Sequence, residues 1–253
     1  MIMERFSLKG KTALVTGSSR GLGAEIAVAL AEAGASVAVH GSRSAPEATK
    51  KLVNKAGSDS FALVGDVSDP AACVSLVEQV VEYFGRIDIL VNNAGIIRRA
   101  PAIEYSDEDW KAVLDTDLTS VFLLTRQAGK HMLAQGSGKI INIASLLTFQ
   151  GGILVPAYAA AKGAVGQLTK AFANEWAAKG INVNAIAPGY MATDNTEALR
   201  ANPERSRQIL ERIPAGRWGN PEDLAGAAVY LASSASDYMH GHVIVVDGGW
   251  LCR

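Results

Sequence analysis

The sequence predicts an α/β fold in which one parallel sheet is covered by helices on both faces. Three observations support this prediction. Short, apolar, β-branched runs alternate with stretches of helical periodicity along the 253 residues. These runs are too apolar to keep one face in water, which is typical of strands buried on both sides. Neither a linker nor a low-complexity segment interrupts the alternation, so we expect residues 1–253 to form a single domain.

Each strand is expected where an apolar, β-branched run occurs. The first run reads KTALVT and the last reads HVIVV. The predicted strands cover residues 11–16, 36–40, 61–65, 87–92, 139–144, 181–187 and 242–246. The sequence therefore predicts a doubly wound parallel sheet of about seven strands.

Helices are expected between the strands, and several have clear start and stop signals. Asp69-Pro70 places an N-cap before a proline at the first helical position, and Ser106-x-x-Asp109 resembles a capping box. Gly34 and Gly180 stand where C-caps are expected. The predicted helices cover residues 22–33, 69–84, about 107–134, 156–179, 203–212 and 221–231, and a further one opens near residues 44–47. The widest gap, residues 191–202, is expected to be a loop over a site.

Composition and charge exclude several classes of protein. The 24 Lys and Arg against 25 Asp and Glu give a net charge of −1, which argues against a protein that coats nucleic acid. Cys73 and Cys252 form no C-x-x-C and only 4 His are present, so we expect idle or buried thiols and no metal site. No apolar run reaches ~18 residues, so no membrane span is expected. The N-terminus lacks the apolar region of a signal peptide, which favours a cytoplasmic protein.

A glycine-rich turn follows the first predicted strand. Thr16–Gly23 reads T-G-x-x-x-G-x-G and leads directly into a helix. A pyrophosphate at a helix N-terminus needs exposed N–H groups and close approach of the backbone, which glycines permit. An ordinary glycine-rich turn is the alternative, but the position at a strand-to-helix junction favours dinucleotide binding. The spacing differs from the usual G-x-G-x-x-G.

The end of the second predicted strand indicates which dinucleotide is bound. NAD binders usually carry an acid there for the ribose hydroxyls, whereas this chain has His40-Gly41-Ser42-Arg43 and no acid before Glu47. Arg20 and Arg43 are suited to clamping a 2′-phosphate, with Ser42 donating a hydrogen bond. The sequence therefore favours NADP(H), with NAD(H) possible. The alternative is that both arginines are solvated surface residues.

Tyr158 and Lys162 form a candidate acid/base pair. The i, i+4 spacing puts the phenol and the ammonium on one face of a helix. The unperturbed pKa of tyrosine is about 10, and a nearby ammonium lowers it by stabilising the phenolate. Ser145 lies just past the fifth predicted strand, at the edge where parallel sheets place their sites. Its hydroxyl is suited to hydrogen-bonding a substrate oxygen.

Taken in order, these motifs resemble the short-chain dehydrogenase/reductase family over essentially the whole chain. The matching positions are Thr16–Gly23, Asp66-Val67, Asn92-Asn93-Ala94-Gly95, Ser145, Tyr158, Lys162 and Pro188-Gly189. The resemblance implies a single Rossmann-type domain, NAD(P)-dependent oxidoreductase activity and a homotetramer.

The resemblance also implies roles for individual residues. Tyr158 would be the proton donor or acceptor, Lys162 would lower its pKa and hold the nicotinamide ribose, and Ser145 would orient the substrate carbonyl. Thr193, in Pro188-Gly189-x-x-x-Thr193, would bind the carboxamide. The cofactor-binding positions it implies are Gly17, Ser19, Arg20, Gly21, Leu22, Gly23, Gly41, Ser42, Arg43, Asp66, Val67, Asn93, Ala94, Gly95, Tyr158, Lys162, Pro188, Gly189 and Thr193. One position departs from the family: Asp117 stands where the family often has an Asn that supports a water chain from the lysine, so we assign it no catalytic role here.

The distal segments resemble one branch of the family. Phe149–Gly152, Asn184–Thr193, Arg212–Gly219 and Asp247–Leu251 are similar to 2-deoxy-D-gluconate 3-dehydrogenases and 2-dehydro-3-deoxy-D-gluconate 5-dehydrogenases. These enzymes act on keto-deoxy sugar acids from pectin or alginate breakdown. A related reductase of the alginate pathway acts on 4-deoxy-L-erythro-5-hexoseulose uronate. A sugar acid needs a cation and hydrogen-bonding groups, for which Arg98, Gln150 and Arg217 are candidates.

Other functions remain open at this point. Within the enzyme class, the alternatives are a 3-oxoacyl-(acyl carrier protein) reductase and a gluconate 5-dehydrogenase. A different class is a non-catalytic NADP-binding sensor, against which the intact set of Ser145, Tyr158 and Lys162 argues.

Overall fold

The computed structural model describes all residues from Met1 to Arg253 and contains one seven-stranded, fully parallel sheet. The strand order is β3-β2-β1-β4-β5-β6-β7. The strands are β1 (Thr12–Val15), β2 (Ser36–Gly41), β3 (Ser60–Val64), β4 (Ile89–Asn92), β5 (Gly138–Ile143), β6 (Ile181–Pro188) and β7 (Val243–Val246). The predicted Rossmann-type fold is therefore confirmed, with strand ends within two residues of those expected from the sequence.

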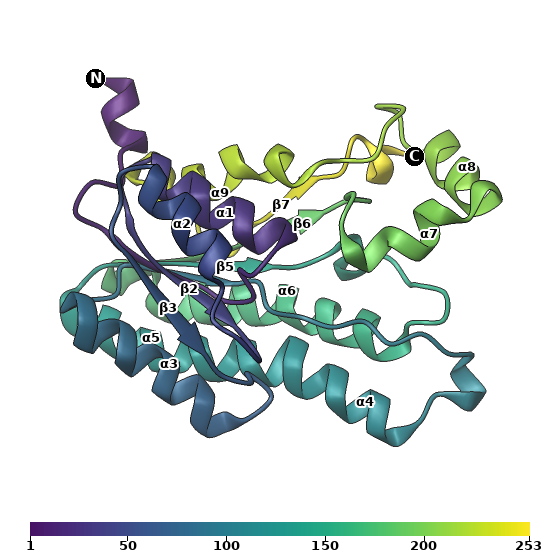
Figure 1. Ribbon diagram of the computed structural model, residues 1–253, viewed down its shortest axis with the longest axis horizontal. Helices are drawn as coiled ribbons and strands as arrows, with labels where there is room; N and C mark the ends of the chain where they lie inside the picture. The colour runs from purple at the N-terminus through teal and green to yellow at the C-terminus, as the bar shows by residue number, and fades with distance from the viewer.

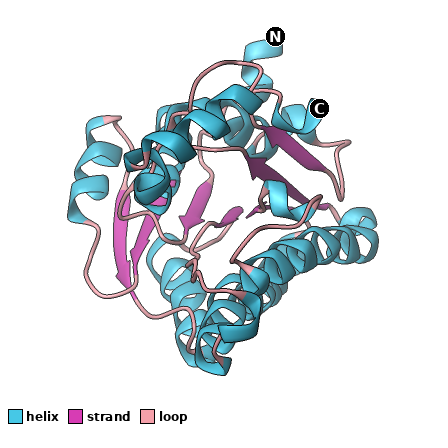
Figure 2. Cartoon of the chain, turned by 90° about the vertical axis from the view of Figure 1, so that its right-hand side faces the viewer, coloured by secondary structure: helices cyan, strands magenta, loops and turns pink.

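Helices cover both faces of the sheet (Figures 1 and 2). In Figure 1, α1, α2 and α9 lie above the sheet, α3, α4, α5 and α6 lie below it, and α7 and α8 lie at one end beside the C-terminus. The helices are α1 (Gly21–Glu32), α2 (Glu47–Lys55), α3 (Pro70–Phe84), α4 (Asp107–Leu114), α5 (Ser120–Gln135), α6 (Pro156–Trp176), α7 (Glu197–Ala201), α8 (Pro203–Arg212) and α9 (Ala225–Ala232).

Local sequence signals account for the helix ends. The Asp69 carboxylate accepts the N–H of Ala71 at 2.9 Å and caps α3, and the Ser106 hydroxyl accepts the N–H of Asp109 at 3.1 Å and caps α4. Gly180, at φ 80°, ends the helical region after α6.

The core has two layers, one on each face of the sheet. A cluster of 21 buried residues joins α1 and α9 to the strands, and a cluster of 18 joins α3, α5 and α6 to the opposite face. Residues of β1 alternate between the clusters, because Ala13 and Val15 belong to the first and Leu14 to the second. The apolar character of the strands therefore follows from burial on both faces.

Two expectations need correction. The helix predicted over 107–134 is two helices, because a π-helical turn at Asp115–Thr119 separates α4 from α5. Residues 191–202 are partly helical rather than a plain loop, since they contain a 3₁₀ turn at Asp194–Thr196 and α7. Both thiols are free, and Cys73 is buried whereas Cys252 is exposed.

Two further properties of the whole chain bear on its function. None of the helices combines the length and the apolar character that crossing a membrane requires. No group of three or more His, Cys, Asp or Glu side chains is arranged to hold a metal ion.

Candidate active site

The predicted site residues lie where the strand order reverses. The chain runs outward from β1 through β2 to β3 and then returns to place β4 on the other side of β1. The glycine-rich turn follows β1, and Asn93-Ala94-Gly95 follow β4. Open α/β sheets bind ligands outside the carboxyl ends of their strands at such a switch point.

The glycines of the turn lie where side chains do not fit. Gly17 and Gly21 have positive φ angles of 62° and 58°. A Cβ on Gly17 would lie 2.8 Å from the Cα of Ala94, and one on Gly23 would lie 2.5 Å from the carbonyl oxygen of Gly17. The backbone can therefore approach a ligand and its neighbours closely only with glycine at these positions.

The N-terminus of α1 presents free donors. Its N-cap, Arg20, makes no side-chain capping bond, and the N–H groups of Gly21, Leu22 and Gly23 have no acceptor within the protein. These donors suit a pyrophosphate, because the helix dipole and the N–H groups both favour an anion there. The turn therefore fits the dinucleotide predicted for it.

A network of hydrogen bonds joins the turn to the loop after β4. The Thr16 hydroxyl accepts the N–H groups of Asn93 and Ala94 at 3.0 and 3.1 Å. The Asn93 amide donates to the carbonyl oxygens of Thr16 and Gly17 at 2.9 and 3.0 Å. Asn93 therefore supports the turn directly, and Thr16 has a structural role that the motif alone did not reveal.

His40 is a second support that the sequence analysis missed. Its Nδ1 accepts the N–H of Gly17 at 3.0 Å, and its Nε2 lies 2.8 Å from the carbonyl oxygen of Gly65. Burial lowers the pKa of His40, so the ring is neutral, with the proton on Nε2. A single imidazole thus links the ends of β1, β2 and β3. In the sequence, the only signal for this supporting role was a histidine at the end of a predicted buried strand.

The residues proposed for a 2′-phosphate lie on the surface at this end. Arg20, Ser42 and Arg43 are exposed, and the Arg20 guanidinium pairs with Asp194 at 2.7 Å. Asp66, which follows β3, is exposed, and Val67 is buried. Hydrogen bonds from Ser68, together with the nearby charge of Arg43, lower the pKa of Asp66.

Segment 191–202 lies over the turn, as expected for a loop over a site. The Thr193 methyl is 3.7 Å from where a Cβ on Gly21 would stand, and Asp194 reaches Arg20. The segment therefore lies next to the glycine-rich turn, and it contains helix where a plain loop was expected.

Tyr158 and Lys162 lie together on the first turns of α6. The Lys162 ammonium is 5.5 Å from the centroid of the Tyr158 ring and donates to the carbonyl oxygen of Ile143 at 2.9 Å. Only 4% of Lys162 is exposed, whereas Tyr158 is half-buried. Ser145 follows β5, and its hydroxyl accepts the N–H of Leu147 at 3.2 Å. Ile143 is the last residue of β5. The lysine therefore ties the helix that carries Tyr158 to the strand that leads to Ser145.

Asp117 lies next to Lys162 in the protein interior. Its side chain is fully buried, Oδ1 accepts the N–H of Ile96 at 2.7 Å, and Oδ2 lies 3.5 Å from the Lys162 ammonium. Burial raises the pKa of this carboxyl group, and the lysine opposes that effect. A Cβ on Gly95 would lie 2.8 Å from Oδ2, so the glycine leaves room for the carboxylate.

Aromatic contacts hold the opposite end of the site. Trp250 lies between Tyr190, with ring centroids 4.5 Å apart, and Arg212, whose guanidinium is 4.0 Å from the ring centroid. The indole N–H donates to Oε1 of Gln150 at 3.4 Å. Gly189 packs against Asp247, because a Cβ there would lie 2.5 Å from the Asp247 Cα. The C-terminal tail therefore connects the loops after β5 and β6.

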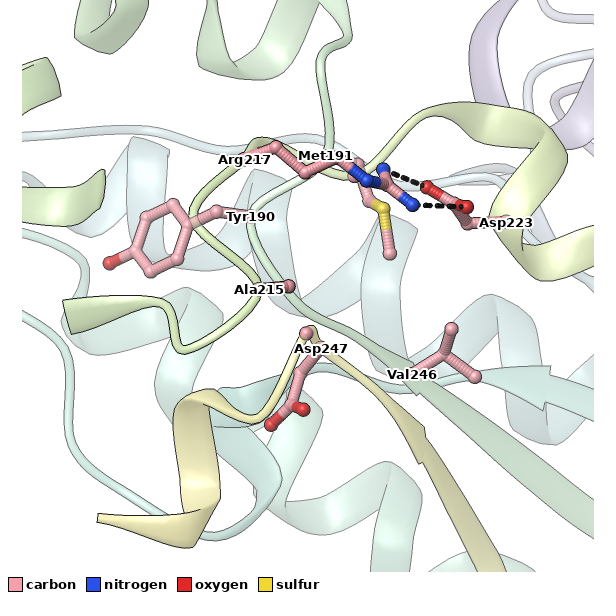
Figure 3. Close-up of a pocket in the computed structure, with 9 residues that line it drawn as sticks. Tyr190, Met191, Ala215, Arg217, Asp223, Val246 and Asp247 are labelled. Atoms are coloured by element: carbon pink, nitrogen blue, oxygen red, sulfur yellow. Dashed lines mark hydrogen bonds and ion pairs between the residues drawn. The ribbon is translucent and has the colours of Figure 1, made fainter. Parts of the chain in front are cut away.

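Two of the proposed substrate residues pair with carboxylates. Arg98 lies 3.3 Å from Asp109. Arg217 donates to both oxygens of Asp223 at 2.6 and 2.8 Å (Figure 3). Arg217 lines a cavity of about 170 Å³ beyond the ends of β6 and β7, and its pairing lowers the pKa of Asp223 to about 2. Each arginine would have to leave its aspartate to bind a substrate carboxylate. Gln150 makes no hydrogen bond through its amide nitrogen, so that donor is free.

The sequence matches a known protein family over nearly its whole length. The family model described as enoyl-(acyl carrier protein) reductase matches residues 17–251. The chain belongs to the short-chain dehydrogenase/reductase family.

Relatives within this family have named activities. The chain is 54% identical over 254 residues to the 2-dehydro-3-deoxy-D-gluconate 5-dehydrogenase of Dickeya dadantii (strain 3937), covering 100% of both chains. It is 56% identical over 250 residues to the enzyme of the same name from Bacillus subtilis (strain 168), covering 99% of this chain and 98% of the relative. A proposed 2-deoxy-D-gluconate 3-dehydrogenase from Agrobacterium tumefaciens, crystallised with bound NADP, is 56% identical with a TM-score of 0.92, covering 98% of this chain and 99% of that chain.

Membership of the short-chain dehydrogenase/reductase family confirms the predicted enzyme class, an NAD(P)-dependent oxidoreductase. It also agrees with the geometry of the cofactor end, where a glycine turn and a free helix N-terminus meet at the switch point. The roles of individual residues remain predictions, and the structure adds Thr16, His40 and Asp117 to the groups that shape the site.

Proposed function

We propose that the chain catalyses reversible, NADP(H)-dependent hydride transfer at a hydroxyl or carbonyl carbon of a deoxy-keto sugar acid, with 2-dehydro-3-deoxy-D-gluconate as the first candidate. The observation that carries the proposal is the buried Lys162 beside Tyr158 at the carboxyl edge of the sheet. Relatives named for this substrate align over the full chain. When bound, the nicotinamide supplies or accepts the hydride.

Tyr158 acts as the general acid and base in this proposal. The Lys162 ammonium is 5.5 Å from the centroid of the phenol ring, where its positive charge stabilises the phenolate that forms when Tyr158 gives up its proton. The Ser145 hydroxyl already accepts the N–H of Leu147, so its own O–H is available to donate to the substrate oxygen. Proton transfer by Tyr158 and orientation by Ser145 are therefore both possible at one substrate oxygen.

The cofactor contacts proposed for the chain follow the family pattern. Free N–H groups at the start of α1 would hold the pyrophosphate, and Arg20, Ser42 and Arg43 would hold a 2′-phosphate. The remaining proposed contacts are Gly17, Ser19, Gly41, Asp66, Val67, Asn93, Ala94, Gly95, Tyr158, Lys162, Pro188, Gly189 and Thr193. Arg20 pairs with Asp194 in the structure, so binding of a phosphate there would exchange one anion for another.

The substrate contacts proposed are Arg98, Gln150 and Arg217. The free amide nitrogen of Gln150 suits a hydroxyl or carboxylate oxygen of a sugar acid. Arg98 and Arg217 lie on the surface and each pairs with an aspartate. We propose that they leave these aspartates to bind the carboxylate of the substrate.

We propose that residues 1–253 form a single dinucleotide-binding catalytic domain that works in the cytoplasm as a homotetramer. An open groove of about 600 Å³ between α5 and α6 supports self-association. It is lined by Leu118, Phe122, Ala164, Leu168 and Ala171. Such an apolar surface is typical of an interface. Phe122→Glu should lower the mass measured by light scattering after size-exclusion chromatography, and a wild-type monomer would contradict the proposed tetramer.

The activity is tested by following reduced nicotinamide absorbance with NADPH and NADH in parallel. The substrates are 4-deoxy-L-erythro-5-hexoseulose uronate for reduction, and 2-keto-3-deoxygluconate, 2-deoxygluconate and gluconate for oxidation. We expect turnover of a deoxy-keto sugar acid with preference for NADP(H). A preference for gluconate, or for a 3-oxoacyl thioester, would identify one of the alternative enzymes and contradict the substrate proposal.

Tyr158→Phe tests the catalytic assignment. It should lower kcat by about 10²- to 10⁴-fold, because general acid/base catalysis contributes on that order. Binding of NADPH, followed by fluorescence, should persist in this variant. A protein that binds NADPH but turns over no substrate in either form would instead be a non-catalytic sensor.

A further inference from the structure

A buried carboxylate faces the lysine of the proposed acid/base pair. Asp117 is fully buried, and its Oδ2 makes no hydrogen bond while lying 3.5 Å from the Lys162 ammonium. The ammonium itself is 4% exposed. A buried carboxylate oxygen without a hydrogen bond is unfavourable unless a nearby charge compensates it. The two groups therefore form a buried ion pair behind Tyr158.

The local backbone fixes the position of the Asp117 carboxylate. Asp117 lies in the π-helical turn at Asp115–Thr119, and such turns are frequent at functional sites. The N–H of Ile96 fixes Oδ1 at 2.7 Å, and Gly95 leaves the space that Oδ2 occupies. The carboxylate is thus held against the lysine from two directions.

Few other charges act on this pair. On α6, Lys162 and Tyr158 are the titratable groups beside it, and β5 contributes the Ile143 carbonyl oxygen. The loop before α4 brings Tyr105, whose pKa burial raises, with Asp109 and Asp117 adding to the effect. Asp109 pairs with Arg98 on the exposed side. One buried cation and one buried anion therefore dominate the field behind Tyr158.

We infer that Asp117 is a positioning residue, which holds the Lys162 ammonium in place and partly neutralises the charge that the ammonium presents to Tyr158. This inference rests on the proposed role of Tyr158. A lysine alone stabilises the phenolate, whereas a lysine paired with an aspartate stabilises it less. The phenol of Tyr158 therefore holds its proton more firmly than it would beside an unpaired lysine, which keeps that proton available for donation to a carbonyl oxygen.

The test is Asp117→Asn, which removes the charge and keeps an oxygen that accepts the N–H of Ile96. Without the negative charge, the ammonium of Lys162 acts on the phenol of Tyr158 unopposed and stabilises the phenolate more. The pH profile of kcat/KM for alcohol oxidation should therefore shift to lower pH, by about one pH unit. Asp115→Asn is the matched control. Asp115 lies on the same π-helical turn as Asp117, but it pairs with Lys111 of α4 and takes no part in the buried pair. Its profile should match that of the wild type.

A second readout does not depend on turnover. The phenolate absorbance of the protein without cofactor is titrated in the wild type, in Asp117→Asn, and in each after the added change Tyr158→Phe, so that Tyr158 is read as a difference. The expected result is that this difference in phenolate absorbance appears at lower pH in Asp117→Asn than in the wild type. If that variant does not fold, Asp117→Ser is measured instead. If neither variant folds, Asp117 has a structural role and the inference is overturned.

The two proposals fail in different ways. If Tyr158→Phe abolishes turnover but Asp117→Asn leaves both the profile and the phenolate titration unchanged, the inference about Asp117 is wrong and the proposed function stands. If Tyr158→Phe retains full turnover, the proposed acid/base role is itself wrong. A lowered kcat with an unshifted pH profile would also count against Asp117 as a modulator of Tyr158.

Discussion

The two ends of the site are built from different kinds of chemical group. At the proposed cofactor end, glycine backbone and free N–H groups form the surface that a ligand would meet, and the buried His40 supports this surface from below. At the proposed substrate end, exposed arginines pair with aspartates, and the aromatic rings around Trp250 hold the loops together. At the first end, a Cβ on Gly17 or Gly23 would clash with neighbouring backbone, whereas the second end depends on particular side chains. Mutations should therefore affect cofactor affinity and substrate KM separately.

Trp250→Ala should have the largest effect of the changes that test this comparison. The indole is 5% exposed and contacts Tyr190, Arg212 and Gln150. Removing a buried tryptophan costs about 3–5 kcal/mol. We expect a lower Tm and a KM for the sugar acid raised at least tenfold, with the Kd for NADPH unchanged.

The measurements are thermal unfolding, steady-state kinetics and fluorescence titration of NADPH. Trp250→Phe is the control, because it keeps an aromatic ring and removes the 3.4 Å bond to Gln150, which contributes about 1 kcal/mol. If Trp250→Ala weakened NADPH binding as much as substrate binding, the two ends would not be separable.

Gly23→Ala should have the opposite selectivity. The added Cβ would lie 2.5 Å from the carbonyl oxygen of Gly17, which is backbone that moves only by distorting the turn. Overpacking of this kind costs about 1–3 kcal/mol. We expect weaker NADPH binding by titration and a lower Tm. Gly226→Ala, on α9 with nothing within 4 Å, should leave NADPH binding as it is and stabilise the helix by up to about 1 kcal/mol. Equal NADPH affinity in both variants would argue against a close-packed turn.

A pH effect on stability should arise at the cofactor end. Burial lowers the pKa of His40 below its usual value, so the unfolded chain takes up a proton at a higher pH than the folded chain. Stability is therefore full above the unfolded value of about 6.5 and declines as the pH falls below it. Thermal unfolding across this range should show a decline in the wild type that is smaller in His40→Gln. His131→Gln, on the surface beside Glu78, should keep the wild-type decline. A decline that is unchanged in His40→Gln would assign it to other groups.

The difference between the two ends also explains what the sequence could predict. The sheet, the glycine turn and the Tyr158–Lys162 pair follow from local patterns, because strand periodicity, a strand-to-helix junction and i, i+4 spacing are written in consecutive residues. The support that His40 gives to Gly17, and the aromatic contacts of Trp250, join residues 23 to 100 positions apart. No local pattern reports such contacts. The π-helical turn at Asp115–Thr119 escaped prediction for a related reason, since its residues continue the helical periodicity on both sides.

Arg217→Gln should have the smallest effect on stability. Its effect on the KM for the sugar acid decides whether Arg217 binds the substrate. Arg217 and Asp223 form an exposed ion pair, which contributes less than about 1 kcal/mol. The pairing lowers the pKa of Asp223 to about 2, so its contribution is present above the unfolded value and is lost as the pH falls through about 2. Unfolding at neutral pH should therefore change little. If Arg217 binds the substrate carboxylate, the KM for the sugar acid should rise at least tenfold, because a charge-assisted hydrogen bond is lost. A lower Tm with an unchanged KM would show instead that Arg217 only anchors its own loop, and the carboxylate would then have to be held by Arg98.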